Sequence, residues 1–199
     1  GCAVMTGVGA VFNTAKVRPG DSVAVVGCGG VGLNVIQGAV IAGATKIIAI
    51  DIEDRALALA RELGATHTVN SAAGNPAAEV HTITGGGVDH AFEVLGRTKT
   101  IELTLEITGR RGQSVLVGMA TPEARPTFDA LSVTVEERVI RGCWYGSCRP
   151  AVDFPILIDL YRSGRIRLDT LTTAIPLNSI NDAFDGLRQG RAGRAVVVF

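Results

Sequence analysis

The stretch that decides the fold is SVAVVGCGGVGLNVIQGAVIA, residues 22–42. Its first five residues form a β-branched apolar run, which is typical of a buried strand. The pattern G-x-G-x-x-G follows directly and opens a segment whose apolar residues recur at helical spacing. A glycine loop between a strand and a helix is the fingerprint of a dinucleotide-binding βαβ unit, in which phosphates lie at the amino end of the helix.

The glycines of this loop have separate expected roles. Gly27 permits the tight turn, and Gly29 lets the backbone approach a pyrophosphate, with Gly30 beside it as a further cofactor-binding residue. Gly32 lets the helix pack closely on the strand. The alternative is an ordinary strand-to-helix turn, but the flanking strand and helix favour the dinucleotide site.

An acidic residue stands where such a site needs one. Asp51 ends the next apolar run, KIIAID, 19 residues after Gly32. A carboxylate there accepts hydrogen bonds from the adenosine ribose and repels the 2′-phosphate of NADP, so we expect NAD as the cofactor. Asp51 is also a candidate N-cap for the helix expected from Glu53, and the two roles are compatible.

Outward from this unit, short apolar runs alternate with amphipathic segments, which predicts an α/β fold with a doubly wound parallel six-stranded sheet of the Rossmann type. We expect strands at 22–26, 46–51, 66–70, 88–94, 114–117 and 138–142, and helices at 31–42, 53–63, 76–84 and 98–108. After Tyr145 the rhythm changes to a helix at 150–162, a strand at 171–176, a helix at 180–188 and a strand at 194–199. Those last elements need not join the same sheet.

Composition excludes several classes of function. The 199 residues carry 19 Lys and Arg against 19 Asp and Glu, so the charge gives no reason to expect nucleic acid or an anionic membrane as a partner. We find no apolar run long enough for a membrane span and no signal peptide. The four cysteines are too irregularly spaced for a disulfide framework, so we expect a cytoplasmic protein with reduced thiols.

No complete catalytic apparatus is visible. The three histidines are scattered, and Cys143 and Cys148 lack the second pair that a tetrahedral metal site needs. Asp89 and Glu93 share one expected strand, where burial gives no support for acid–base work. We expect Asp89 to support the loop Gly85–Gly87 instead.

The order of motifs resembles the zinc-dependent medium-chain alcohol dehydrogenases. The matching stretches cover essentially the whole chain: GCAVMTGVGAVFNTAKVRPGDSVAVVGCGGVGLNVIQGA, IIAIDI, ARELGATHTVN, FEVLGR, VLVGM, RGCWYGSC, DFPILIDLYRSGRI and GRAVVVF. The stretch from WYGSC to LIDLY is most similar to the formaldehyde-oxidising, thiol-adduct branch, which includes actinobacterial mycothiol-dependent enzymes.

The resemblance implies that this chain is the second half of an enzyme whose catalytic domain supplies the other zinc ligands and the proton relay. Residues 1–3 would end that missing domain, 4–145 would form the NAD-binding domain, and 146–199 would return to the catalytic domain. Cys2, in the stretch G-C-x-x-x-T-G, would be a ligand of the catalytic zinc. Thr6 of the same stretch would lie near the nicotinamide.

Further cofactor contacts are implied by the same resemblance. Val31 would back the nicotinamide ring, and Val94 and Leu95 would flank the adenosine ribose. Backbone groups of Val117, Cys143 and Tyr145 would hold the carboxamide of the nicotinamide. Met119 would lie close to the same ring. Arg194 would reach the pyrophosphate. A basic residue common in the family is replaced by Ala56, next to Arg55.

The expected function is the coenzyme-binding part of an NAD-dependent and zinc-dependent dehydrogenase acting on a small alcohol or an aldehyde–thiol adduct. We expect the chain alone to bind NAD without turnover, and the strand at 138–142 to pair in a homodimer or homotetramer. One alternative is a zinc-free quinone or enone reductase of the same superfamily, against which Cys2 argues. Another is a nucleotide-binding module without chemistry of its own.

Overall fold

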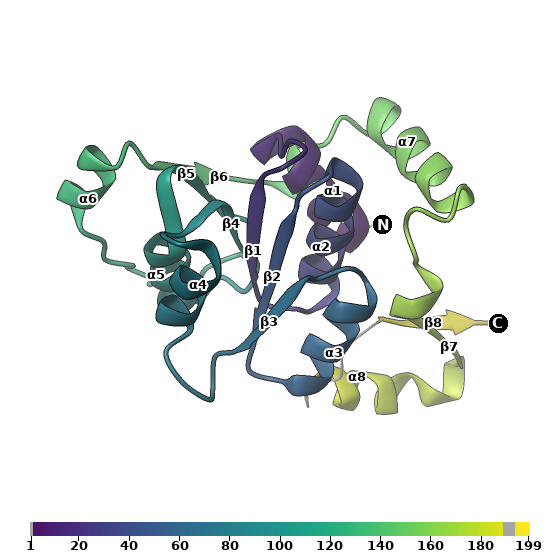
Figure 1. Cartoon of the computed structure of the whole chain (residues 1–199). Helices are drawn as coiled ribbons and strands as arrows, with labels where there is room; N and C mark the ends of the chain where they lie inside the picture. Colours follow the sequence, from purple (N-terminus) through teal and green to yellow (C-terminus); the bar gives the residue numbers. More distant parts are fainter. Residues whose placement is uncertain (1, 189–193) are drawn as a thin grey trace.

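A parallel sheet of six strands forms the centre of the protein (Figure 1). The computed structural model describes residues 2–188 and 194–199. The strands are β1 (Ser22–Val26), β2 (Lys46–Asp51), β3 (His67–Asn70), β4 (Val88–Glu93), β5 (Thr108–Leu116) and β6 (Val139–Gly142). Their order in the sheet is β3-β2-β1-β4-β5-β6, and all pairs are parallel. The doubly wound fold that the sequence predicts is therefore confirmed.

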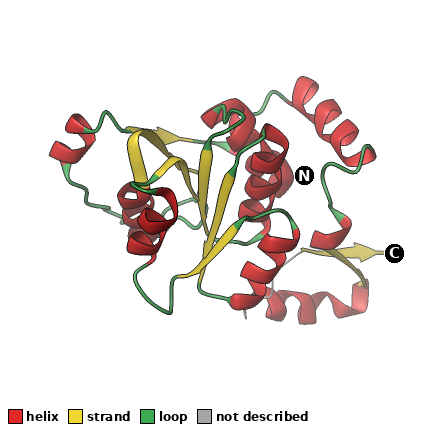
Figure 2. Cartoon of the chain, viewed as in Figure 1, coloured by secondary structure: helices red, strands yellow, loops and turns green. Residues whose placement is uncertain are grey.

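Helices cover both faces of the sheet (Figure 2). They are α2 (Gly30–Ala42), α3 (Asp54–Glu62), α4 (Pro76–Thr84) and α5 (Thr98–Ile107). Side chains of α2 and α3 share one buried cluster with alternate residues of the strands, such as Val23 and Val25 of β1. Side chains of α4 pack in a second cluster with Ala24 and Val26, which point to the other face of the same strand. Burial on both faces explains why the strands read as continuous apolar runs.

The amino-terminal segment is a helix that the sequence analysis did not predict. Helix α1 (Cys2–Gly9) continues as the π-helix η1 (Ala10–Ala15), and it packs against α2. A Cβ on Gly7 would lie 2.6 Å from Cβ of Asn34, so only glycine permits this approach. The segment escaped prediction because its small residues give neither a cap nor a polar face.

Two further differences lie near the far edge of the sheet. β5 begins at Thr108, whereas a strand was expected only from Ser114. The register of β5 against β4 shifts between Val88 and His90, and Arg111 has a φ of 60°, so this part of the strand is irregular. Its sequence, TGRRG, therefore looks like a turn. The short helix α6 (Ala130–Val135) was also not predicted; it has only six residues and buries none of them.

The carboxyl-terminal elements stand apart from the main sheet, as expected. After the short 3-10 helix η2 (Tyr145–Ser147) they are α7 (Pro150–Arg162), η3 (Asp169–Leu171), β7 (Thr172–Pro176), η4 (Leu177–Ser179), α8 (Ile180–Arg188) and β8 (Arg194–Val198). β7 and β8 pair only with each other among the described strands. Helix α7 packs against α1 through Leu157, Met5 and Val8. Within the described residues, no helix has the length and apolarity that a bilayer crossing requires.

Candidate functional site

A cleft of ≈ 440 Å³ opens at the carboxyl ends of β1 and β2. It lies where the strand order reverses between β1 and β4, which is the place at which open α/β sheets bind ligands. The glycine loop and the end of β2 with Ile52 and Glu53 line it. Arg97, Thr100 and Leu103 also belong to its lining. Leu187 and Arg194 reach it from the carboxyl-terminal segment.

The glycine loop has the geometry that its sequence predicts. Gly27 has a φ of 103°, a region that favours glycine, and its N–H donates to the carbonyl of Ile50 at 2.8 Å. A Cβ on Gly32 would lie 1.8 Å from the Gly27 oxygen, so this position accepts no side chain. Gly29 faces open space, with no atom within 4 Å of an added Cβ. The loop therefore leaves room for a ligand at Gly29 and at the first turn of α2.

The first turn of α2 is favourable for an anion. Gly29 occupies the N-cap and supplies no side-chain acceptor, so N–H groups of the turn face the cleft end of the helix. Nε of Arg194 lies 3.4 Å from the place where a Gly30 Cβ would stand. A guanidinium and the positive end of a helix dipole thus converge, as a pyrophosphate group requires. The residues present fit the phosphates of a dinucleotide.

Asp51 is held by two backbone donors. Its Oδ2 accepts the N–H of Cys28 at 2.6 Å, and its Oδ1 accepts the N–H of Glu53 at 3.0 Å. The N-cap role suggested for Asp51 is wrong, because the N-cap position of α3 is Glu53, whose side chain makes no capping bond, and the helix begins at Asp54. Each oxygen keeps a second lone pair for a ribose hydroxyl. Burial and the Asp51 charge raise the pKa of the Cys28 thiol, which stays neutral beside the carboxylate.

The loop after β4 is organised by a carboxylate that the sequence analysis did not assign to the site. Glu93 is fully buried and accepts hydrogen bonds from the N–H groups of Leu95 and Gly96 and from the hydroxyl of Thr100. Leu95, half-exposed, lines the cleft, and Val94 lies beside it against Gly27. An acid inside the apolar run of a central strand was the available signal for Glu93.

The residues expected around the nicotinamide lie elsewhere along the same edge of the sheet. Val117 and Cys143 directly follow β5 and β6, and Met119 is largely exposed. Gly7, the residue after Thr6, packs on α2 at Val31, since a Gly7 Cβ would lie 2.6 Å from the Val31 oxygen. Tyr145 precedes Gly146, which packs against the Thr6 oxygen. None of these six residues lines the ≈ 440 Å³ cleft, so their roles stay predictions.

Cys2 begins α1 and is exposed. Its Sγ lies 3.9 Å from Oγ1 of Thr6. Across residues 2–188 and 194–199, no group of three or more metal-binding side chains occurs. A catalytic zinc takes three protein ligands, so the described residues do not by themselves fit a zinc ion.

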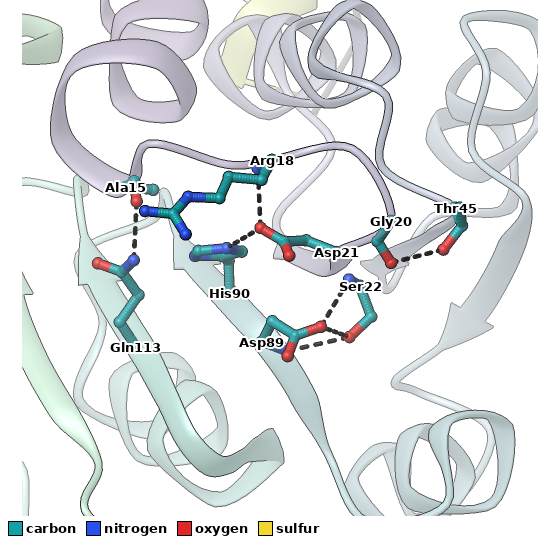
Figure 3. A network of polar contacts seen from close by, with 9 residues as sticks. All are labelled: Ala15, Arg18, Gly20, Asp21, Ser22, Thr45, Asp89, His90 and Gln113. Carbon is teal, nitrogen blue, oxygen red and sulfur yellow. Dashed lines mark hydrogen bonds and ion pairs between the residues drawn. The ribbon is translucent and has the colours of Figure 1, made fainter.

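Polar residues also cluster at the opposite end of β1 (Figure 3). Nε2 of His90 lies 2.8 Å from Oδ2 of Asp21, and Asp89 accepts the N–H and hydroxyl of Ser22 at 2.8 and 2.6 Å. The expectation that Asp89 supports the loop Gly85–Gly87 is wrong, because Thr84 accepts the Gly87 N–H there. This cluster joins β1 to β4 at the amino ends of the strands and is remote from the cleft in the fold.

Residues 30–163 match the family model described as zinc-binding dehydrogenase. The chain is 38% identical over 208 residues to S-(hydroxymethyl)glutathione dehydrogenase of Paracoccus denitrificans, covering 100% of this chain and 55% of the relative. It is also 38% identical over 209 residues to the class-3 alcohol dehydrogenase of Cereibacter sphaeroides, with the same coverage. The chain thus spans about half the length of the curated relatives it matches.

Solved structures of alcohol dehydrogenases are also similar to this chain over about half of their length. Benzyl alcohol dehydrogenase from Acinetobacter calcoaceticus superposes with a TM-score of 0.96 at 34% identity, over 99% of this chain and 54% of that one. An alcohol dehydrogenase zinc-binding domain protein from Burkholderia ambifaria superposes with a TM-score of 0.95 at 38% identity, over 100% and 54%. The similarity therefore extends beyond the glycine loop to the carboxyl-terminal elements.

Proposed function

This chain belongs to the zinc-binding dehydrogenase family, and on that premise we propose that it is the coenzyme-binding part of an NAD-dependent alcohol dehydrogenase. One observation carries the proposal: the glycine loop, Asp51 and Arg194 line a single cleft at the switch point of the sheet. NAD, when bound, would accept or supply the hydride. The residues of this chain bind and orient it.

Each end of the proposed site has a defined task. Asp51 accepts the ribose hydroxyls, and its charge disfavours a 2′-phosphate. The first turn of α2 and the Arg194 guanidinium neutralise the pyrophosphate. Glu93 fixes the loop that carries Leu95 against the adenosine side. We assign the nicotinamide end to the edge formed by Thr6, Val31, Val117, Met119, Cys143 and Tyr145.

The parent reaction is proposed from the relatives. One of them is named S-(hydroxymethyl)glutathione dehydrogenase and another alcohol dehydrogenase class-3, which supports an alcohol or an aldehyde–thiol adduct as the substrate class. Cys2 would serve as one zinc ligand beside ligands from outside the described residues. We retain the division 1–3, 4–145 and 146–199 as a proposal, although α1 continues from Cys2 to Gly9 without a break across its first boundary.

Assembly and location are part of the same proposal. Strand β6 lies at the edge of the sheet and all four of its residues are exposed, which supports pairing with a second copy in a homodimer or homotetramer. A cytoplasmic location accords with the four free cysteines.

The test is calorimetric titration of the chain with NADH, followed by an assay for alcohol oxidation with NAD and zinc. We expect one NADH per chain and no turnover. An absence of NADH binding would refute the proposed function, and turnover would show that the chain holds its own catalytic groups. Binding of NADH without any activity in the longest available form of the protein, with zinc supplied, would favour the non-catalytic module.

A further inference from the structure

Two neutral amide side chains are buried together on α2. Asn34 is 1% exposed and Gln37 is 3% exposed, and a spacing of three residues puts them on one face of the helix. Buried amides are costly unless their donors and acceptors are paired. The partners of this pair lie at two distant places in the chain, the glycine loop and the segment after α7.

The pair forms a continuous row of hydrogen bonds. The backbone N–H of Arg167 donates to Oε1 of Gln37 at 2.7 Å. Nε2 of Gln37 donates to Oδ1 of Asn34 at 3.4 Å. Nδ2 of Asn34 then donates to the carbonyl oxygen of Gly30 at 2.7 Å. The row therefore runs from the carboxyl-terminal segment to the first residue of α2.

The direction of the row is fixed by its ends. A backbone N–H at Arg167 only donates, and a carbonyl at Gly30 only accepts, so each side chain between them must accept on one side and donate on the other. A primary amide does this without carrying a charge. This requirement also settles which amide atom of Asn34 and Gln37 is oxygen and which is nitrogen.

Three parts of the protein meet at this pair. Gly7 of α1 covers Asn34, since a Cβ on Gly7 would lie 2.6 Å from the Asn34 Cβ. Gly30 begins α2 at the proposed pyrophosphate site. Arg167 is anchored on its other side by α3, because its guanidinium donates to the carbonyl of Glu62 at 2.9 Å and to Oε1 of Glu62 at 2.6 Å. The segment around Arg167 is thus attached twice. The amide row, formed by Gln37 and Asn34, joins it to α2, and the outer attachment joins its guanidinium to Glu62 of α3.

We propose that Asn34 and Gln37 are positioning residues for the coenzyme. They hold the first turn of α2 to the segment at 164–168, so that a pyrophosphate bound at the turn and the placement of that segment depend on each other. The proposal rests on the proposed NAD site. Coupling between two sites is reciprocal. If the row of hydrogen bonds favours the conformation of the α2 turn that binds NAD, then bound NAD stabilises the row.

The main variant is Gln37→Met, which keeps a similar volume and removes both the acceptor and the donor. Its control is Arg167→Ala, which removes the outer attachment to Glu62 and keeps the Arg167 N–H for Gln37. Calorimetric titration with NADH reports the affinity of folded molecules, while the stoichiometry reports the folded fraction. Hydrogen exchange of the Arg167 amide, with and without NADH, is the second readout.

We expect Gln37→Met, which removes two bonds of the row, to weaken NADH binding about tenfold, within the usual size of the coupling between two sites, and Arg167→Ala to leave the affinity within about twofold. NADH should slow exchange at Arg167 in the unmodified chain and not in Gln37→Met. Equal affinities of Gln37→Met and the unmodified chain overturn the inference, as does an equal loss in Arg167→Ala.

A second variant covers the case in which Gln37→Met does not fold. Gln37→Glu keeps the acceptor for the Arg167 N–H, replaces the donor to Asn34 with a second acceptor and adds a negative charge, so weakened NADH binding is expected again. Unchanged affinity in Gln37→Glu overturns the inference. An unmodified chain that binds no NADH refutes the proposed function as well, whereas normal binding in every variant refutes the amide row alone.

Discussion

Oδ2 of Asp51 accepts the backbone N–H of Cys28 at 2.6 Å, which joins the end of β2 to the glycine loop after β1. The acid that is expected to select the cofactor therefore also helps to shape the loop that is expected to bind its phosphates. A second backbone donor, the N–H of Glu53, holds the other oxygen at 3.0 Å. The carboxylate is thus oriented by the protein before any ligand arrives, and its orientation leads to the first prediction.

Replacing Asp51→Asn should lower the preference for NADH over NADPH. Asparagine keeps the volume and one acceptor but removes the charge that repels a 2′-phosphate. Loss of one charged hydrogen bond predicts NADH binding weaker by about tenfold or more, with NADPH much less affected. Titrations with both cofactors measure the ratio. Glu53→Gln, at the neighbouring acid of the cleft, is the control, and an unchanged ratio in Asp51→Asn would contradict the assigned role.

Gly32→Ala should destabilise the fold. The added Cβ would lie 1.8 Å from the Gly27 oxygen, a backbone atom that cannot move without opening the loop. Overpacking of this kind costs about 1–3 kcal/mol, measured as the free energy of unfolding in urea. Gly74→Ala is the matched control, because no atom lies within 4 Å of its added Cβ. If both variants unfold like the unmodified chain, the close packing of α2 on the loop is wrong.

Asp89 should contribute to stability in a pH-dependent way. Partial burial acts to raise the pKa of Asp89, but the hydrogen bonds from Ser22 outweigh it and leave this pKa below its usual value. A carboxyl group whose pKa is lowered on folding stabilises the native state above the unfolded pKa of about 4, and this stabilisation is lost as the pH falls. The destabilisation caused by Asp89→Asn should therefore be larger at pH 7 than at pH 3 in urea titrations. An equal cost at both pH values would argue against the Ser22 contact.

Cys28 should resist alkylation in the native chain. Burial and the nearby Asp51 raise the pKa of its thiol, and the thiolate is the reactive form. Cys2, by contrast, is exposed at the start of α1. Timed treatment with iodoacetamide at pH 8, followed by peptide mass analysis, should label Cys2 well before Cys28. In urea both should react; labelling of native Cys28 as fast as Cys2 would show that the loop opens readily.

Much of the fold could be predicted from local sequence because the strands are buried on both faces. The runs at Ser22–Val26 and Lys46–Asp51 have the bounds that their apolar residues indicate. Helix α1 could not be predicted, because Gly7 and its small neighbours are explained only by the approach of α2. The start of β5 could not be predicted for a related reason. Its irregular register depends on how β5 pairs with β4, which the sequence of β5 alone does not show.

The site was only partly predictable. The glycine loop and Asp51 follow from a strand–loop–helix pattern that specifies its own geometry. Glu93 and the amide pair on α2 do not, because their roles arise from partners that are set by the fold. Glu93 is satisfied by the loop that follows it, and Gln37 by an N–H that is 130 residues away in the chain. Sequence spacing carries no record of such a contact.

The measurement that tests the central claim most directly is the NADH affinity of Gly29→Ala. Gly29 has a φ of −78°, which alanine adopts readily, and no protein atom lies within 4 Å of the added Cβ, so the fold should be unchanged. A methyl group at this place would occupy the space expected for the pyrophosphate. We predict normal unfolding in urea together with NADH binding weakened by about tenfold or more, while Gly74→Ala binds normally. Undiminished NADH binding in a folded Gly29→Ala chain would contradict the assignment of this cleft to the dinucleotide.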